Sequence, residues 1–475
     1  MAKKSNAIDM TKGNPITLML RFALPMMIGG VFQSLYHMVD SAVLGRYVGS
    51  EALASIGSSS STINMLLMLA TSITSAVSIV ISHQIGSGNK EKIRAGMVST
   101  IYLTTIVSIS LGLIAFFIAR PLMQLLDTPA NVIDGSVTYI KWICGLCIIT
   151  FTYNSASSIM RAIGDSKTPL ICLIVCSILN VIFDLIAVIW LNMAVAGVAI
   201  ATLISQAISA VFCITYMFKK YPMLRITVKD LKPDMKVTKE IFVMGLQMAL
   251  QSALLSVGMM VITGVINSYG SNVVAAFTVG SNVQGLAAML FSNFAFGFSV
   301  YVGQNYGARN VERIQLGVRR IFLLIGGLTL FATTLTLIFA DFLVGLYIKA
   351  EELEVVEASL SFVRIQACFF PFLGWIWMYN STMRGMGKIT ITTISSFVEL
   401  GSKIGLSILL PILLGSYVGI WYAAPIGWVL GILPNAIYYY GGFWKKALKK
   451  LMEKEAKEKA KAETEAAAAV EPAEA

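Results

Sequence analysis

Charged residues are scarce in this chain. Asp, Glu, Lys and Arg make up 13% of its 475 residues and hydrophobic residues make up 56%, whereas soluble domains carry about 25% charged residues. The charges that are present are clustered, which excludes an ordinary soluble domain. A membrane-spanning helix needs about 20 mostly apolar residues. The sequence therefore predicts an all-α integral membrane protein with twelve transmembrane helices, at 16–45, 53–84, 95–119, 134–160, 169–192, 195–218, 241–268, 273–302, 321–346, 359–383, 389–414 and 417–444.

Histidine and cysteine are also few, at two and six residues. Cys144 and Cys147 form a CxxC, but this motif lies within a predicted membrane helix and no cluster of cysteine and histidine accompanies it. We interpret the cysteines as small buried apolar side chains rather than zinc ligands or redox groups. The chain also has no Gly-rich phosphate loop and no catalytic-triad pattern. We therefore expect no enzyme activity, no ATP-driven transport and no cofactor other than a coupling ion.

The chain contains an internal duplication. Residues 83–93 align with residues 304–314 at a constant offset of 221, and residues 160–164 align with residues 383–387 at an offset of 223. Each half holds six predicted helices, an even number, so both halves enter the membrane from the same side. The sequence thus predicts two six-helix lobes related by a pseudo-two-fold axis along the membrane normal. Such repeats are typical of transporters whose site lies between the lobes.

The positive charges indicate the orientation. When both termini are placed in the cytoplasm, only Arg46, Arg120 and Lys349 fall in the outer loops. Cytoplasmic segments carry an excess of Lys and Arg, so we favour this placement, in which the net charge of +11 faces anionic lipid rather than nucleic acid. The predicted organisation is a cytoplasmic N-terminus (1–13), an N-lobe (14–220), a cytoplasmic linker (221–236), a C-lobe (237–446) and a charged cytoplasmic tail (447–475) that is either a solvated, frayed helix or disordered.

Ionisable residues deep in the membrane mark candidate sites, because each costs roughly 2.5–3.5 kcal/mol to insert unless it faces a cavity or a partner. Asp40 lies in the first predicted helix and Asp184 in the fifth, where Asn180 shares its face at a spacing of four residues. Two carboxylates close together in a low dielectric cannot both stay ionised and bare. One must hold a proton, or a cation such as Na⁺ must lie between them with further oxygen ligands from Asn180 and Thr202.

The C-lobe carries a different pair at the equivalent place. Glu399 and Lys403 are four residues apart in the eleventh predicted helix, so they can neutralise each other. We interpret them as a structural or gating pair rather than a second ion site. Arg161 and Arg384 end helices at the inner face, where we also expect structural roles, because long basic side chains reach the membrane surface there.

The chain resembles the multidrug and toxic compound extrusion (MATE) family of the MOP superfamily, and within it the prokaryotic DinF-like branch. The resemblance covers residues 14–446 and is most specific at the paired Gly86…Asn89 and Gly307…Asn310 loops. It implies an N-lobe cation site made by an Asp in the first helix, an Asn-x-x-x-Asp in the fifth, a Thr in the sixth and a Tyr in the fourth. The matching positions here are Asp40, Asn180, Asp184, Thr202 and Tyr139.

Some of these residues have simpler interpretations. Asn180 could bond across helices, Thr202 could bond to its own helix backbone, and Tyr139 could be an aromatic residue of the membrane interface. The NorM-like branch uses acids in the seventh and tenth helices for a C-lobe cation site. The predicted seventh helix of this chain contains no acid, which argues against that site.

The resemblance and the deep carboxylates together predict a secondary active multidrug exporter. It would antiport amphipathic or cationic compounds against Na⁺ or H⁺ by alternating access, as a monomer in a bacterial or archaeal cytoplasmic membrane, with small organic substrates and lipid as its partners and no nucleic acid. The alternative is a flippase for lipid-linked oligosaccharides or other amphiphiles, which needs a strongly cationic cleft. Flexible thioethers and aromatic faces suit a cleft of broad specificity, and the cleft candidates are Gln33, Tyr36, Met27, Gln251 and Met260.

Overall fold

The computed structural model describes residues 6–227, 230–349 and 351–470, and within these ranges it leaves the side chains of residues 34–46, 50, 53, 458–459 and 461–470 undescribed. Every regular element in the described part is a helix. Ten helices there are long and apolar enough to cross a membrane, and up to twelve spans result when two bent helix pairs are each counted as one. This agrees with the twelve predicted spans.

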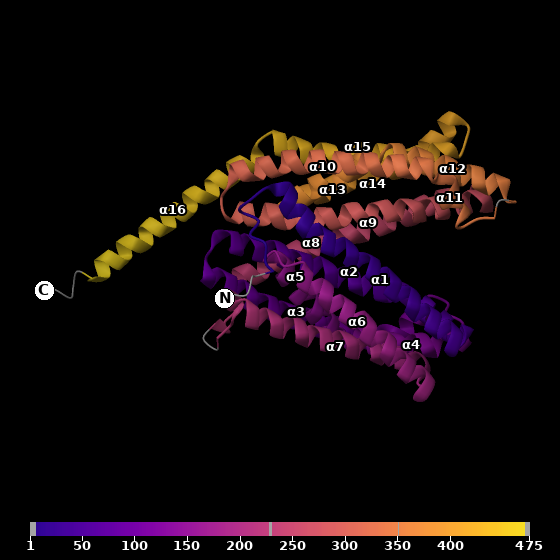
Figure 1. Cartoon of the computed structure of the whole chain (residues 1–475), viewed down its shortest axis with the longest axis horizontal. Helices are drawn as coiled ribbons and strands as arrows, with labels where there is room; N and C mark the ends of the chain where they lie inside the picture. The colour runs from indigo at the N-terminus through magenta and orange to yellow at the C-terminus, as the bar shows by residue number, and fades with distance from the viewer. Residues whose placement is uncertain (1–5, 228–229, 350, 471–475) are drawn as a thin grey trace.

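The helices form two lobes. The N-lobe, coloured indigo to magenta in Figure 1, consists of α1 (Pro15–Tyr47), α2 (Ser50–Ser87), α3 (Lys90–Leu125), α4 (Ala130–Gly145), α5 (Cys147–Ala162), α6 (Lys167–Leu185), the π-helix η1 (Ile186–Trp190) and α7 (Ala194–Lys220). A 3-10 turn, η2 (Pro222–Leu224), follows. The C-lobe consists of α8 (Met235–Asn267), α9 (Ser271–Gly307), α10 (Val311–Ile338), α11 (Ala340–Gly345), α12 (Leu353–Cys368), α13 (Phe370–Gly385), α14 (Ile389–Leu414) and α15 (Val418–Tyr440).

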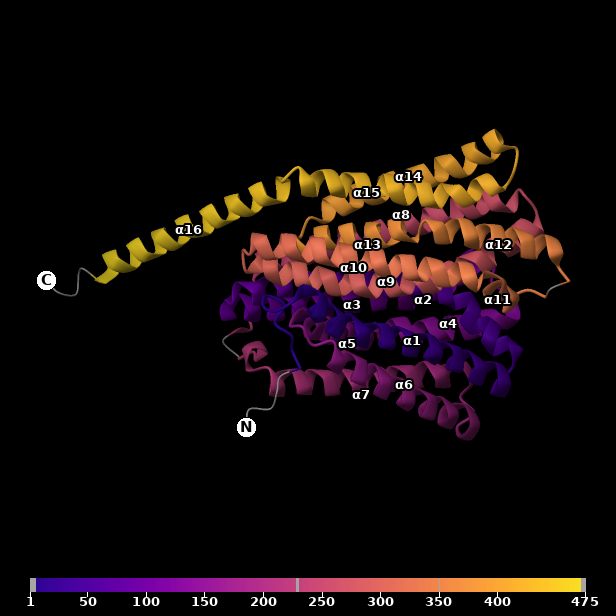
Figure 2. The same cartoon turned by 45° about the horizontal axis from the view of Figure 1, so that its top comes forward.

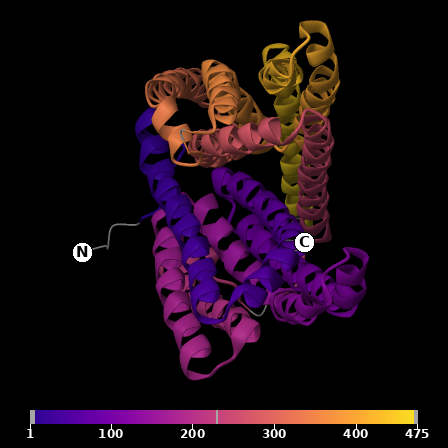
Figure 3. The ribbon, with the colours of Figure 1, turned by 90° about the vertical axis from the view of Figure 1, so that its right-hand side faces the viewer.

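A last helix, α16 (Phe443–Val470), projects beyond the two lobes (Figure 2). The end-on view in Figure 3 places the N-lobe helices below and the C-lobe helices above. Residues 447–470, for which the sequence left a frayed helix or disorder open, are helical. Their run of Lys, Glu and Ala explains this, because these residue types have the highest helix propensities.

Each lobe contains one broken span, and the two breaks are equivalent. α4 and α5 meet at 46° and α12 and α13 at 53°, with the breaks at Leu146 and Phe369, 223 residues apart. Pro371 in the first turn of α13 accounts for the second break, since proline cannot donate to a preceding helix. The break at Leu146 has no proline beside it. α1, in contrast, continues as a helix through Pro25.

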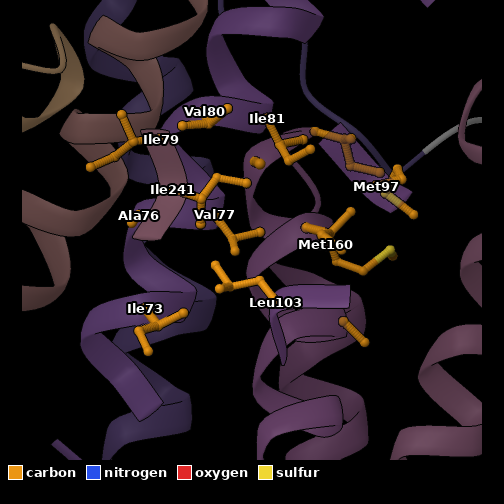
Figure 4. Packing of buried hydrophobic residues seen from close by; sticks show 14 of the residues in the cluster. Ile73, Ala76, Val77, Ile79, Val80, Ile81, Met97, Leu103, Met160 and Ile241 are labelled. Atoms are coloured by element: carbon orange, nitrogen blue, oxygen red, sulfur yellow. The ribbon is translucent and has the colours of Figure 1, made fainter. Parts of the chain in front are cut away.

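The N-lobe core joins α2 to helices of both lobes. Ile73 and Val77 of α2 pack with Leu103 of α3 and Met160 of α5 in one buried cluster, which also contains Ile241 of α8 (Figure 4). Since lipid is as apolar as these side chains, close packing rather than water exclusion stabilises such contacts. α8 therefore links the C-lobe to the N-lobe core.

The paired glycine–asparagine loops begin α3 and α10. The Asn89 side chain accepts the backbone N–H groups of Glu91 and Lys92 over 2.9 and 3.1 Å, which caps α3. Asn310 caps α10 through one such bond, from the backbone N–H of Arg313 over 3.0 Å. The residue before each cap has a left-handed conformation, at φ 69° for Gly88 and φ 60° for Arg309. These two turns, residues 6–14 and the start of α16 lie at one end of the molecule, which we name the terminal end.

Candidate functional site

α6 and α7 bring three of the predicted ion-site residues together inside the N-lobe. Asn180 and Asp184 lie on one face of α6 and are 0% and 1% exposed, and Thr202 of α7 is 8% exposed. Nδ2 of Asn180 donates to Oγ1 of Thr202 over 3.2 Å. The spacing of four residues thus places both α6 side chains on one buried face, and Asn180 of that face bonds to α7.

The other two predicted ion-site residues lie on neighbouring helices. Asp40 is in α1, outside the residues whose side chains are described, and α1 packs against α6. Tyr139 lies on α4, half-buried at the edge of an apolar cluster that contains Met123 and Ile140, and α4 packs against α7.

The buried N-lobe cluster has the chemistry of a hard-cation or proton site. Asp184 supplies carboxylate oxygens, Asn180 an amide oxygen and Thr202 a hydroxyl, which are the oxygen ligands that hard cations prefer. A carboxylate at this depth is favoured when it is protonated or when a cation lies against it. The donor set therefore fits Na⁺ or H⁺ and gives no preference between them.

The C-lobe pair, Glu399 and Lys403 of α14, packs against α15. Nζ of Lys403 lies 2.5 Å from Oε1 of Glu399, and the two side chains are 15% and 12% exposed. A Cβ added at Gly427 would lie 2.5 Å from Cγ of Lys403, and one added at Gly431 would lie 2.9 Å from Cβ of Glu399. The ammonium also lies 5.8 Å from the ring centroid of Trp428. The pair is thus part of the α14–α15 interface.

A cavity of about 490 Å³ lies between the lobes. α2 lines it from the N-lobe, and α8, α9 and α13 line it from the C-lobe. Its polar side chains include Ser75, Ser78, Ser292, Ser299, Asn380 and Arg384. A volume of this size suits a drug-sized organic molecule.

The four predicted cleft residues whose side chains are described are not among the residues that line this cavity. Met27 is half-buried in C-lobe packing, Gln33 is exposed, and Met260 is 74% exposed. Gln251 is 2% exposed and bonded to α13 and α14, and Tyr36 lies outside the described side chains. The sequence locates a residue along its helix but does not fix the helix face.

Conversely, the cavity contains residues that the sequence analysis missed or interpreted differently. Arg384, which we expected at the membrane surface in a structural role, lines the cavity. Its place in the repeat that aligns residues 160–164 with residues 383–387 was the available signal. The serines carried none, because membrane helices are rich in serines that bond their own backbone. Cys368 is exposed, whereas the other five cysteines are buried as predicted.

α2 and α9 cross in close contact at the terminal end of the cavity. A Cβ added at Gly86 would lie 1.9 Å from the carbonyl oxygen of Gln304, and one added at Gly307 would lie 2.0 Å from the carbonyl oxygen of His83. Only glycine allows the two backbones to approach this closely. The glycines of the paired loops therefore permit an inter-lobe crossing.

Two equivalent hydrogen bonds accompany this crossing. Nε2 of His83 donates to the carbonyl oxygen of Gly385 over 2.7 Å, and Nε2 of Gln304 donates to the carbonyl oxygen of Ala162 over 2.7 Å. Each bond joins the two lobes. Since the donors are 221 residues apart and the acceptors 223, the bonds are related by the internal duplication. These two hydrogen bonds thus hold the lobes in contact at the terminal end.

Comparisons with known proteins agree with this architecture. The MatE family model matches residues 25–186 and 248–409, the same part of each lobe. The chain is 26% identical over 451 residues to the probable multidrug resistance protein YpnP of Bacillus subtilis, covering 94% of this chain and 100% of that protein. It is 24% identical over 394 residues to the probable multidrug resistance protein NorM of Thermotoga maritima, covering 80% and 82% of the two chains.

Solved structures share the fold. A crystal structure of MATE in the bent conformation matches with a TM-score of 0.84 and 23% identity, over 93% of this chain and 98% of that one. An outward-facing multidrug resistance MATE family transporter of the MOP superfamily matches with a TM-score of 0.82 and 23% identity, over 94% and 100% of the two chains. With the family model matching more than half of the sequence, once in each lobe, the chain belongs to the MATE family of multi-pass membrane transporters.

Proposed function

We propose that the protein is a secondary active multidrug exporter that antiports amphipathic, often cationic organic compounds against Na⁺ or H⁺. The names of its relatives, which are multidrug resistance proteins, support the substrate class. The observation that carries the coupling is the buried N-lobe cluster of Asn180, Asp184 and Thr202. A carboxylate held at that depth responds to a proton or a cation.

α1 is the element through which ion binding would move the lobes. It carries Asp40, packs against α6, which carries Asp184, and also packs against α9 and α10 of the C-lobe. Its contact with α9 is tight, since a Cβ added at Gly297 would lie 2.8 Å from Cδ1 of Phe22. Pro25 lacks a backbone donor, so α1 bends most easily there. A change at the ion site would therefore reach the C-lobe through α1.

The distribution of Lys and Arg supports placing the terminal end in the cytoplasm of a bacterial or archaeal cell, because positive charge accumulates on that side. In this orientation the bonds of His83 and Gln304 close the cytoplasmic side, which corresponds to an outward-facing state. The proposed exporter acts as a monomer.

Transport into or out of proteoliposomes tests the proposal. Ethidium efflux is measured with an imposed Na⁺ gradient and then with a pH gradient, for the native chain and for Asp40→Asn and Asp184→Asn. Asp134→Asn is the matched control, because that N-lobe carboxylate is 76% exposed. We expect one gradient to drive efflux and both ion-site variants to lose it while the control retains it. Coupled efflux at the native rate in both ion-site variants would refute the proposal.

The flippase alternative has one observation in its favour, the cationic side chain of Arg384 in the cavity. A pyrophosphate-bearing lipid would require several such cations. Among the residues that line the cavity, Arg384 is the only Lys or Arg. The exporter is therefore the better supported of the two functions.

A further inference from the structure

The charge of the inter-lobe cavity is opposite to that expected of a site for cations alone. The fourteen lining residues, all in the described part of the chain, include one basic side chain, Arg384, and no Asp or Glu. The other polar groups are hydroxyls, one amide and the indole of Trp377. Four of the hydroxyls donate to their own helix backbone, those of Thr71, Ser75, Ser292 and Ser381. The buried hydroxyl of Ser78, in contrast, has no partner among the described residues and can donate to an anion. A cationic ligand would find no carboxylate in this lining.

Arg384 is held at the cavity wall without a counter-charge. Its Nη2 donates to Oε1 of Gln251 over 2.9 Å. Its Nε is buried and has no hydrogen-bond partner among the described residues. None of the ion pairs among those residues includes Arg384. A guanidinium has five N–H donors, and a buried charge without a partner is costly.

Gln251 fixes the position of this guanidinium. Its Nε2 donates to the carbonyl oxygen of Thr392 over 3.2 Å and to Oγ of Ser396 over 2.5 Å. These two bonds direct the amide oxygen toward Arg384 and determine which way the amide faces. Gln251, on α8, is therefore a positioning residue that aims Arg384 of α13.

Arg161 is the N-lobe arginine equivalent to Arg384, and its hydrogen bond differs from those of Arg384. Nε of Arg161 donates to the carbonyl oxygen of Ser157, in its own helix, over 3.2 Å. Its guanidinium lies 5.2 Å from the ring centroid of Phe296, a favourable contact for a cation. Arg161 thus uses its Nε to close the end of α5, whereas Nε of Arg384 has no such acceptor. The duplication produced two arginines, and Arg384 alone lines the cavity.

We propose that the inter-lobe cavity binds an anionic group, a carboxylate or a phosphate, through Arg384, with the organic body of the same molecule against Trp377, Phe296 and Met248. This inference rests on the proposed function, in which the cavity lies on the export path, and it extends the substrates to anionic and zwitterionic amphiphiles. The anionic group belongs either to a soluble organic compound or to the headgroup of a phospholipid.

Equilibrium binding to the full-length protein tests this proposal. The protein is placed in phosphatidylcholine nanodiscs and titrated calorimetrically with 2-naphthoate, 2-naphthyl phosphate and 2-naphthylmethylammonium, which share one ring system but differ in charge. Empty nanodiscs are the blank. We expect saturable binding of both anions and binding of the cation that is roughly tenfold weaker or more, since hydrogen bonds to a charged group contribute about 1.5–3 kcal/mol. Equal or tighter binding of the cation to the native chain would overturn the proposal without any variant.

Variants then test Arg384 itself. Arg384→Gln is expected to weaken anion binding roughly ten- to hundredfold, and Arg384→Lys to restore part of it. Gln251→Leu is expected to lower anion affinity while leaving the charge in place. The control is Arg364→Gln, which removes an arginine of α12 whose side chain is 54% exposed and paired with Asp341. Unchanged anion binding in folded Arg384→Gln would overturn the assignment.

A second set of nanodiscs, containing phosphatidylglycerol, distinguishes the two sources. If the anionic lipid displaces 2-naphthyl phosphate from the native chain but not from Arg384→Lys, the occupant is a lipid headgroup. If the probe binds equally in both membranes, the occupant is a soluble anion. Because binding is measured without any ion gradient, a failure here leaves coupled export standing. Likewise, loss of coupling in Asp184→Asn leaves anion binding unaffected.

Discussion

The glycine crossing of α2 and α9 leads to a prediction that can be worked out from the structure. In Gly86→Ala the new methyl group would lie 1.9 Å from the carbonyl oxygen of Gln304, while ordinary contact begins at 3.4 Å. The two helices must therefore separate by about 1.5 Å. The obstacle is backbone, not a flexible side chain, so no rotamer change can relieve it. Gly307→Ala meets the same obstacle at the carbonyl oxygen of His83, at 2.0 Å.

The energetic consequence falls on the closed terminal end. Overpacking of this kind costs about 1–3 kcal/mol. The separation also stretches the bonds from His83 to Gly385 and from Gln304 to Ala162, each 2.7 Å long and each contributing about 0.5–1.5 kcal/mol. Together these effects disfavour the closed arrangement by about 2–6 kcal/mol, which changes the ratio of closed to open molecules roughly 30- to 20,000-fold.

Distances between spin labels measure this change. Labels at Glu91 and Glu312, which are exposed and occupy equivalent positions in the two loops, are introduced into a cysteine-free background. We expect Gly86→Ala to lengthen and broaden the distance distribution and to slow efflux. Gly57→Ala is the control, because it adds a methyl group to the same helix with nothing within 4 Å. An unchanged distance distribution in Gly86→Ala, with unchanged thermal stability, would refute the reasoning.

Two further predictions concern charges. Lys403→Met leaves the carboxylate of Glu399 buried and unpaired, so it should lower the free energy of unfolding by about 3 kcal/mol. The double variant Glu399→Met/Lys403→Met should recover most of this loss, because no buried charge is then left unpaired. Denaturant unfolding in detergent measures both variants, and a double variant that is no more stable than Lys403→Met contradicts the prediction. Arg309 donates two hydrogen bonds to Glu455 of α16, and these bonds, with smaller effects of nearby positive charge, lower the pKa of Glu455. A lowered carboxyl pKa stabilises the Arg309–Glu455 contact fully at a pH above the ordinary pKa of 4.5, and this stabilisation is lost as the pH falls through the lowered pKa. The contact of α16 with Arg309 should therefore persist at neutral pH and loosen in acid. Glu455→Gln should loosen this contact at neutral pH, which is measured as faster cleavage by trypsin within α16. Equal cleavage rates in the variant and the native chain would contradict the prediction.

The sequence was sufficient to predict the fold. Hydrophobic length gave the twelve spans, and the constant offsets gave the two lobes. The two broken spans show what the sequence leaves undetermined. Pro371 accounts for the break near Phe369, but the break at Leu146 has no proline beside it, and only the offset of 223 connects the two. For the tail the sequence left a frayed helix or disorder open, because its lack of an apolar face and its high helix propensity favour opposite outcomes.

Part of the candidate site could be predicted from the sequence and part could not. Asn180 and Asp184 could be predicted to share a buried face because membrane carboxylates are costly and the spacing is local. The cavity could not be predicted, since its lining comes from four helices whose rotation is set by packing between lobes. Met260 and Met248 illustrate this. Both lie on α8, yet Met260 is 74% exposed whereas Met248 lines the cavity.

The duplication makes a final prediction about His83. It occupies the position equivalent to Gln304, and both side chains donate to a carbonyl of the opposite lobe. If His83 acts only as a donor, His83→Gln makes the two halves alike and should keep the terminal end closed. His83→Ala leaves the carbonyl of Gly385 without this donor and should cost about 1–3 kcal/mol, seen as a longer distance between the labels at Glu91 and Glu312. If His83→Gln opens the terminal end as much as His83→Ala does, hydrogen bonding alone does not explain the histidine, and the contact of its ring with Tyr306, at 5.2 Å between ring centroids, becomes part of the closing mechanism.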